Sequence, residues 1–283
     1  MTGARRDFSS AADGVRSSPL SADEIAAYHR DGQLTPKFRL PHAKFARLRG
    51  AVDALIMARS AGDTDFIALP HIPGPDPRSH ALSREIFESA LDDELLDVAE
   101  QLIGPDIALW ATAIFGKPPR IGREVPWHQD GRYWPIRPRA TVTFWIALDA
   151  STPRNGCMRV IPGSHRGGLM NHTASGSEDL VLNTHVQDSR LDEALARDIV
   201  LEPGQVSLHH IDIAHGSRPN RSTERRAGVT FRYMPTTSVF DRTLPEYQGS
   251  NQVAVPWRDR PIWLVRGIDR SGHNDFEIGH GAW

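Results

Sequence analysis

The first hundred residues carry hydrophobic positions at helical spacing. The segment that ends at Gly32 begins with Ser21 and, three positions later, Glu24, which is the pattern of an N-terminal capping box. Apolar residues then recur with helical periodicity at about 42–61 and again at about 83–103. This pattern predicts three helices in the N-terminal part of the chain.

The pattern changes at about residue 106, where short segments rich in Val, Ile, Thr, Phe and Trp alternate with Pro and Gly. These segments are IALWATAIF, ATVTFWIALD, CMRVIPG, GQVSLHH and AGVTFRYM. Short β-rich segments separated by turn residues are typical of a β-sandwich or barrel. The chain is therefore predicted to be mainly β with N-terminal helices, in the α+β class.

We expect a single domain that follows a flexible N-terminal tail. The tail, residues 1–19, is small and polar. The domain, residues 20–283, would combine a helical part at about 20–104, a β core at about 106–240 and a C-terminal extension at about 241–283.

Composition and charge exclude several classes of function. The formal net charge is −2 and the basic residues are scattered, so neither nucleic acid nor a membrane is an expected partner. Cys157 is the only cysteine, which rules out a disulfide framework. The N-terminus lacks the apolar segment of a signal peptide, and no apolar run of about 18 residues predicts a spanning helix. The cytoplasm is the expected location, and nothing in the sequence indicates an oligomeric state.

The stretch WHQDGRYWPIRP contains a candidate metal site. In a strand, His128 and Asp130 would point to the same face and could bind one ion. His215 is the best candidate for a third ligand, and His209 and His210 are its rivals. Two imidazoles and one carboxylate form the facial triad of non-haem Fe(II) oxygenases, which leaves positions open for oxygen and a cosubstrate. The alternative is an exposed turn, because an isolated H-x-D triplet often arises by chance.

Two predicted strands place further polar residues on one face. Arg226, Gly228, Thr230 and Arg232 alternate with apolar residues, and no acidic residue is evident on their face. A buried arginine there needs a carboxylate partner, so a ligand carboxylate is a natural candidate for Arg226, unless this arginine lies at the surface. Trp145 lies among small and polar residues, where its ring could pack against a flat ligand or simply belong to the core.

Four stretches carry a resemblance when they are taken together. They are HQDGRYWPIRP, TVTFWIALD, NGCMRVIPGSHRGG and HGSRPNRSTERRAG. In order and spacing, over about residues 106–235, they resemble the phytanoyl-CoA dioxygenase family of Fe(II)/2-oxoglutarate-dependent oxygenases. This resemblance implies a double-stranded β-helix, also called a cupin-like jelly roll, and Fe(II), 2-oxoglutarate and O2 as the groups used in the reaction.

The resemblance also implies roles for single residues. By position within the motifs, the iron ligands correspond to His128, Asp130 and His215, and the groups around 2-oxoglutarate correspond to Arg226, Ser217 and Trp145. Halogenating relatives have Ala or Gly in place of the metal carboxylate. Because Asp130 is present, hydroxylation or a related oxidation such as desaturation or ring formation is expected instead.

The expected substrate is a small anionic or zwitterionic metabolite. The residues that could contact it are Arg132, Tyr133, Trp134 and Arg232. The polar insert 170–195 could form a lid or an ordinary surface excursion. Two other functions compete with a 2-oxoglutarate-dependent oxygenase: a cupin-like metal-binding protein without turnover, and an Fe(II) dioxygenase that does not use 2-oxoglutarate.

Overall fold

Two antiparallel sheets form the centre of the protein in the computed structural model, which describes residues 19–60, 63–245 and 255–280. The larger sheet has the order β1 (Gln33–Leu34), β11 (Val206–His210), β6 (Val142–Ala147), β13 (Arg226–Pro235), β3 (Ile107–Lys117) and β15 (Trp263–Arg266), with β2 (Ile67–Ala68) also paired to β3. The smaller sheet has the order β10 (Arg197–Ile199), β7 (Met158–Val160), β12 (His215–Ser217) and β4 (Val125–His128). Apart from residue 19, the tail predicted at residues 1–19 lies outside the described residues.

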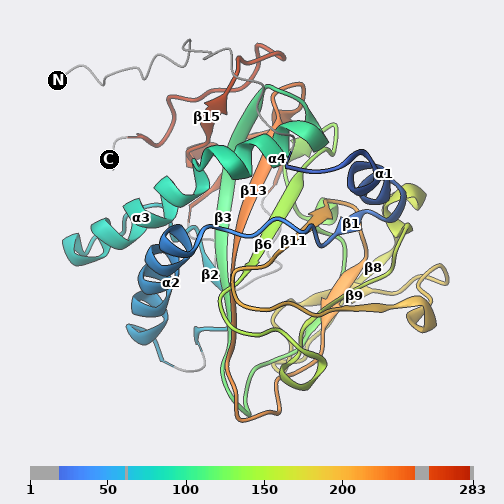
Figure 1. The fold of residues 1–283 in the computed structure, drawn as a ribbon. Coiled ribbons are helices and arrows are strands. Elements are labelled where there is room, and N and C mark those ends of the chain that lie inside the picture. The colour runs from blue at the N-terminus through green and yellow to red at the C-terminus, as the bar shows by residue number, and fades with distance from the viewer. Residues whose placement is uncertain (1–18, 61–62, 246–254, 281–283) are drawn as a thin grey trace.

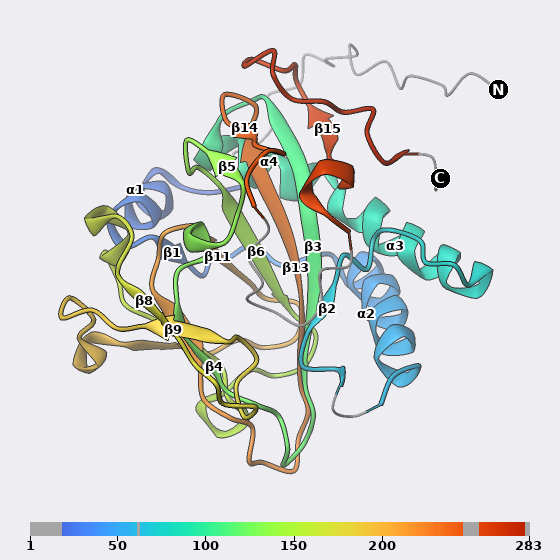
Figure 2. The same ribbon diagram turned by 180° about the vertical axis from the view of Figure 1, so that it is seen from behind.

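Two short pairs of strands complete the β structure. One pairs β14 (Val239–Phe240) with β5 (Ile136–Arg137), and the other pairs β8 (His172–Ala174) with β9 (Thr184–Val186). The β8–β9 pair lies beside β4 (Figure 2). All five strand-like segments of the sequence form strands, so the predicted mainly β architecture with N-terminal helices is confirmed.

The helices are α1 (Ala22–Asp31), α2 (His42–Met57), α3 (His80–Ala90) and α4 (Asp93–Ile103). The capping box of Ser21 and Glu24 begins α1, and Gly32 ends it with a left-handed φ of 75°. The single helix predicted at about 83–103 is wrong, because the chain breaks between α3 and α4. There the side chain of Asp92 accepts a hydrogen bond from the Glu94 amide and starts a new helix.

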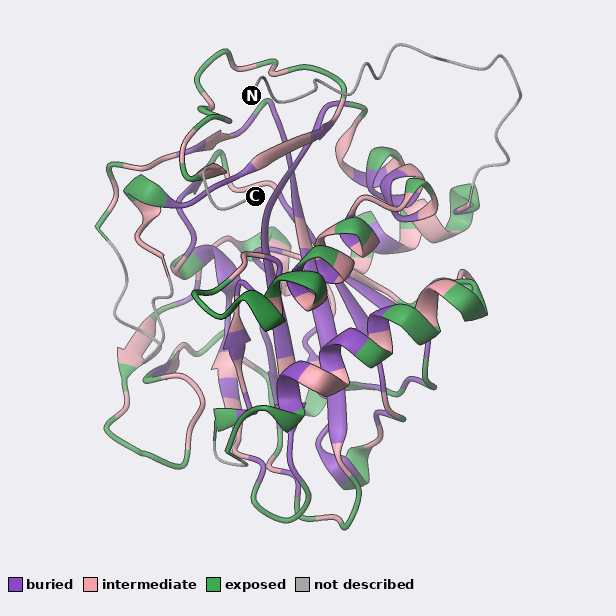
Figure 3. Ribbon diagram, turned by 90° about the vertical axis from the view of Figure 1, so that its left-hand side faces the viewer, coloured by how far each residue is buried: buried purple, intermediate pink, exposed green. Residues whose placement is uncertain are grey.

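The larger sheet is buried on both faces for different reasons. Helices α2, α3 and α4 lie along its outer side (Figure 1), where residues such as Leu109, Phe144 and Phe231 join the main hydrophobic core. The strands are buried along most of their length, whereas the helices have both exposed and buried residues along their length (Figure 3). The inner side bears polar residues that line a cavity shared with the smaller sheet. No helix within the described ranges is long and apolar enough to cross a membrane.

Candidate active site

Three side chains that could bind a metal meet where the two sheets face each other. His128 ends β4, His215 begins β12, and the two are direct partners in the antiparallel register, with ring centroids 4.1 Å apart. Asp130 begins a 3-10 turn rather than continuing the strand, so the predicted strand geometry is wrong at this residue. The carboxylate still reaches the histidines, with Oδ1 3.6 Å from Nε2 of His128 and Oδ2 4.0 Å from Nε2 of His215.

Backbone carbonyls fix the orientation of both imidazoles. Nδ1 of His128 lies 2.8 Å from the carbonyl oxygen of Pro126, and Nδ1 of His215 lies 3.1 Å from that of Ile213. Nδ1 therefore carries the proton in each ring, and the lone pair of Nε2 points toward the carboxylate. Burial lowers the pKa of His215 well below its ordinary value, which keeps the ring neutral. Two oriented imidazoles and a carboxylate suit Fe(II).

His209 lies beside the triad, and His210 does not. Nε2 of His209 is 3.8 Å from Oδ2 of Asp130, and its ring is 4.9 Å from that of His215. Burial alone would raise the pKa of Asp130, but neighbouring groups, the charge of Arg232 among them, hold it far below its ordinary value. His210 instead accepts a hydrogen bond from the Asp212 amide. The described group whose ligand atoms come together consists of His128, Asp130 and His215.

A cavity extends from the triad along the inner face of the larger sheet, with about 450 Å³ of empty space when the part open to solvent is included. Its walls come from both sheets. The lining residues are Phe115, Val125, His128, Asp130, Thr143, Trp145, Met158, His209, His215, Gly216, Ser217, Arg226, Thr230 and Arg232. Strand alternation predicted that Trp145 on β6 and Arg226, Thr230 and Arg232 on β13 each lie on the polar face of their strand. The structure places these residues in the cavity lining.

Arg226 lies in this cavity without a carboxylate partner. It is 3% exposed, its Nη2 is 3.5 Å from the Ser217 hydroxyl, and its guanidinium carbon lies 5.3 Å from the centre of the Trp145 ring. Its Nε has no hydrogen-bond partner. Burial lowers the pKa of Arg226 to about 10, so it stays charged at neutral pH. A buried, partly unsatisfied guanidinium favours the binding of an external carboxylate.

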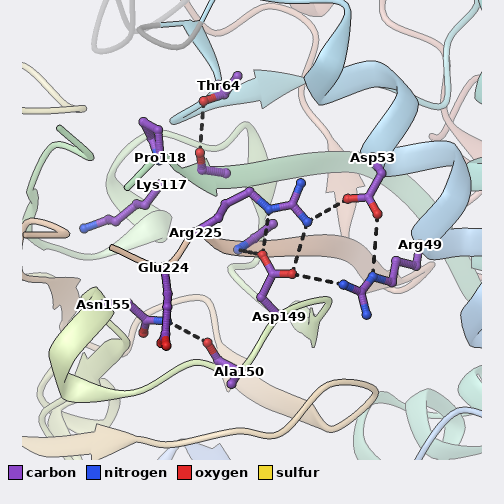
Figure 4. A network of polar contacts seen from close by, with 12 residues as sticks. Arg49, Asp53, Thr64, Lys117, Pro118, Asp149, Ala150, Asn155, Glu224 and Arg225 are labelled. Carbon is purple, nitrogen blue, oxygen red and sulfur yellow. Dashed lines mark hydrogen bonds and ion pairs between the residues drawn. The ribbon is translucent and has the colours of Figure 1, made fainter. Parts of the chain in front are cut away.

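The neighbouring arginine shows the opposite situation. Arg225 points to the other side of the strand, where its guanidinium contacts Asp149 and Asp53, each at 2.7 Å (Figure 4). Arg49 joins the same network through both carboxylates. These ion pairs account for Arg225 as a structural residue.

Lys117 is a functional candidate that the sequence analysis missed. It is opposite Arg226 in the register of β3 and β13, it is 1% exposed, and its Nζ donates to the carbonyl oxygens of Ser217 and Arg218. Burial, with the charge of Arg226 nearby, lowers the pKa of Lys117 to about 6. Lys117 thus holds Ser217 in place beside Arg226. The only available sequence signal was a lysine at the end of an apolar strand.

The four candidate substrate residues have different surroundings. Arg232 lines the cavity, whereas Trp134 lies outside the lining and packs against Arg232 with its ring centre 4.6 Å from the guanidinium carbon. The Tyr133 hydroxyl is hydrogen-bonded to the Thr184 hydroxyl on β9. Arg132 is exposed at the surface. The structure therefore brings one of these four residues into the cavity.

The insert at 170–195 is fastened to the metal-site loop. Gln129, between the two proposed ligands, accepts a hydrogen bond from the Met170 amide at 2.6 Å and donates one to the carbonyl of Gly168 at 3.0 Å. The Gln129 amide in turn donates to Nε2 of His172 at 3.1 Å. The insert thus places the β8–β9 pair against the segment that carries the proposed metal ligands.

Gly228 leaves the space that Trp145 occupies, and alanine at this position should disturb both. A Cβ at Gly228 would overlap the indole ring, so we expect Gly228→Ala to lower the free energy of unfolding by about 1–3 kcal/mol. Gly50, in the middle of α2, has open space around its Cα, so Gly50→Ala should raise stability by up to about 1 kcal/mol. Urea denaturation of both variants measures this contrast, and equal effects would contradict the packing described for Trp145.

Solved structures share this fold. The apo form of the non-haem monooxygenase ThoJ superposes with a TM-score of 0.65 at 25% identity, over 89% of this chain and 86% of ThoJ. EctD from S. alaskensis with 2-oxoglutarate and 5-hydroxyectoine gives a TM-score of 0.61 at 22% identity, over 93% and 90% of the two chains. The double-stranded β-helix is confirmed. This fold and the His-Asp-His cluster define the protein as a member of the non-haem iron oxygenase class.

Sequence comparison identifies the family within this class. A model of the phytanoyl-CoA dioxygenase (PhyH) family matches residues 28–228, so the chain belongs to this family. The ectoine dioxygenase of Sphingopyxis alaskensis is 29% identical over 249 residues, which cover 80% of this chain and 79% of the relative. A probable alpha-ketoglutarate-dependent hypophosphite dioxygenase of Stutzerimonas stutzeri is 33% identical over 143 residues, and human peroxisomal phytanoyl-CoA dioxygenase is 31% identical over 153 residues. The match to the Stutzerimonas protein covers 50% of this chain and 50% of the relative. The match to the human protein covers 52% of this chain and 45% of the relative.

Proposed function

We propose that the protein is an Fe(II)- and 2-oxoglutarate-dependent dioxygenase. It would hydroxylate an unactivated C–H bond of a small anionic or zwitterionic metabolite, and 2-oxoglutarate and O2 would yield succinate and CO2. The observation that carries the proposal is the cavity that joins the metal cluster to a buried Arg226 without a carboxylate partner. Action in the cytoplasm on a small molecule is part of the same proposal.

In this proposal the chain orients reactants and excludes water. His128, Asp130 and His215 would hold the iron, which supplies the oxidising chemistry together with O2 and the cosubstrate. Arg226 and the Ser217 hydroxyl would bind the distal carboxylate of 2-oxoglutarate and so fix its direction.

The surroundings of these groups would keep their geometry constant during the reaction. Trp145 would pack along the cosubstrate, and Lys117 would keep the Ser217 segment in position through its two carbonyl contacts. The carbon that lies nearest to the metal would be the one oxidised, because positioning decides which bond reacts.

A cupin-like protein that binds a metal without turnover is the second candidate. A metal holder has no need of a buried, unpaired arginine at the far end of its cavity, and an unsatisfied buried charge is costly. The unpaired Arg226 therefore favours the enzyme.

An anaerobic titration tests the proposed function. Metal-free protein receives Fe(II) and then 2-oxoglutarate, and we expect a weak visible charge-transfer band only when both are present. Succinate has two carboxylates but no keto group, so it should give no band and serves as the matched control. No band with 2-oxoglutarate, although Fe(II) binds, would exclude the proposed cosubstrate and favour the metal-binding protein or an Fe(II) dioxygenase without it.

A further inference from the structure

A row of three polar side chains crosses the larger sheet beyond the metal cluster. His209 on β11 and Arg232 on β13 are both register partners of Thr143, which lies between them on β6. All three line the cavity. Arg232 follows Arg226 along β13 on the same face, about 20 Å further at about 3.3 Å per residue. The row therefore lies at the end of the cavity away from the proposed position of the distal 2-oxoglutarate carboxylate.

Each member of this row has a buried polar atom without a partner. Oγ1 of Thr143, Nδ1 of His209 and Nε of Arg232 make no hydrogen bond. Thr143 is 1% and His209 is 3% exposed. Within the described part of the chain, the Arg232 side chain takes part in no hydrogen bond or ion pair. Buried polar atoms are rarely left unsatisfied, so three such atoms on adjacent strands point to a ligand.

Aromatic rings hold the Arg232 side chain in place. Its guanidinium carbon lies 4.6 Å from the centre of the Trp134 ring and 5.8 Å from that of Trp110. The two indoles contact each other at 4.6 Å, edge to face. Stacking fixes the plane of the guanidinium and removes it from water, while its N–H groups stay available for a planar anion.

The charges in the cavity indicate which sign of charge a bound substrate group would carry. Asp130 is the only acidic residue among the described residues that line the cavity. In the proposed loaded site, the charges of Fe(II) and Arg226 balance those of Asp130 and the 2-oxoglutarate dianion. The charge of Arg232 is then left over, and a ligand that carries an anionic group would neutralise it.

We propose that Arg232 and Thr143, bounded by His209, form the binding site for a carboxylate or phosphonate group of the substrate. The guanidinium would bind two oxygens of this group and the Thr143 hydroxyl would donate to one of them. This inference rests on the proposed function, and it adds the chemical class of the substrate and the residues that select it. The anionic group would anchor the substrate so that a neighbouring carbon faces the metal.

Binding of simple probes to the Ni(II)-loaded enzyme with saturating 2-oxoglutarate tests this site without turnover. The probes are butyrate, propylphosphonate and butyramide, a neutral analogue of butyrate, and titration is followed by tryptophan fluorescence, because Trp134 contacts Arg232. We expect saturable binding of at least one anion and none of butyramide, and the preferred anion identifies carboxylate or phosphonate. Arg232→Met should weaken anion binding about tenfold or more, and Thr143→Val several-fold.

A second measurement separates this site from the cosubstrate site. With Fe(II) under anaerobic conditions, Arg232→Met should bind 2-oxoglutarate as the wild type does, judged by the charge-transfer band. The inference is wrong if butyramide binds as well as the anions, if the wild type binds no anion, or if Arg232→Met weakens 2-oxoglutarate as much as the probe. If the wild type shows no band, the proposed function itself is wrong, and this outcome is distinct from a failure of the inference about Arg232. If Arg232→Met does not fold, the Thr143→Val variant and the comparison of anionic with neutral probes still test the inference.

Discussion

Replacement of His215 by alanine is expected to abolish iron binding and turnover together. Two ligands would remain, His128 and Asp130, and two groups hold a divalent metal poorly. Changes that only disturb the partners of metal ligands cost about 10–100-fold in affinity or activity, so loss of a ligand should cost more than about 100-fold. The measurements are the charge-transfer band in the anaerobic titration and succinate release in the presence of O2.

His210→Asn is the matched control for this variant. His210 lies five residues before His215, its Nδ1 accepts the Asp212 amide, and it does not line the cavity. Asparagine can accept the same hydrogen bond through its side-chain oxygen, so iron binding and succinate release should stay at wild-type levels. If His210→Asn lost iron while His215→Ala kept it, the ligand assignment would be reversed.

The strands and the faces of the core could be predicted because local sequence determines them. Alternation along RAGVTFRYM separates Arg226, Thr230 and Arg232 from Val229 and Phe231, and the structure places the first set in the cavity and the second in the helix-covered core. The signal was clear because the inner face of this sheet is polar and the outer face is apolar. The capping box of α1 was equally local.

Features that depend on contacts between distant segments could not be predicted. The break between α3 and α4 was missed because apolar periodicity continues through Asp92, although an aspartate followed by acidic residues is a helix-start signal. The choice between His209 and His215 depends on the pairing of β12 with β4, which spacing along the chain does not reveal. The contact between Trp134 and Arg232 likewise joins residues about a hundred positions apart, so no local pattern indicates it.

Replacement of Arg226 by methionine is expected to raise the KM for 2-oxoglutarate by about 100-fold or more. Removing one partner of a buried, hydrogen-bonded charge pair typically costs about 3–5 kcal/mol, and each 1.4 kcal/mol is about tenfold in binding. Arg226→Lys keeps the charge but loses the planar fork, so a smaller rise of about tenfold is expected. The kcat at saturating 2-oxoglutarate should change little in both variants, because Arg226 does not contact the metal cluster. Steady-state succinate release as a function of 2-oxoglutarate concentration measures both constants.

Arg225→Met separates this effect from a loss of structure. Arg225 is the preceding residue, but its guanidinium contacts Asp149 and Asp53 outside the cavity. Its replacement should lower the free energy of unfolding and leave the KM for 2-oxoglutarate unchanged. If Arg226→Met instead retained full activity and substrate oxidation needed no 2-oxoglutarate, the protein would be an Fe(II) dioxygenase of another kind.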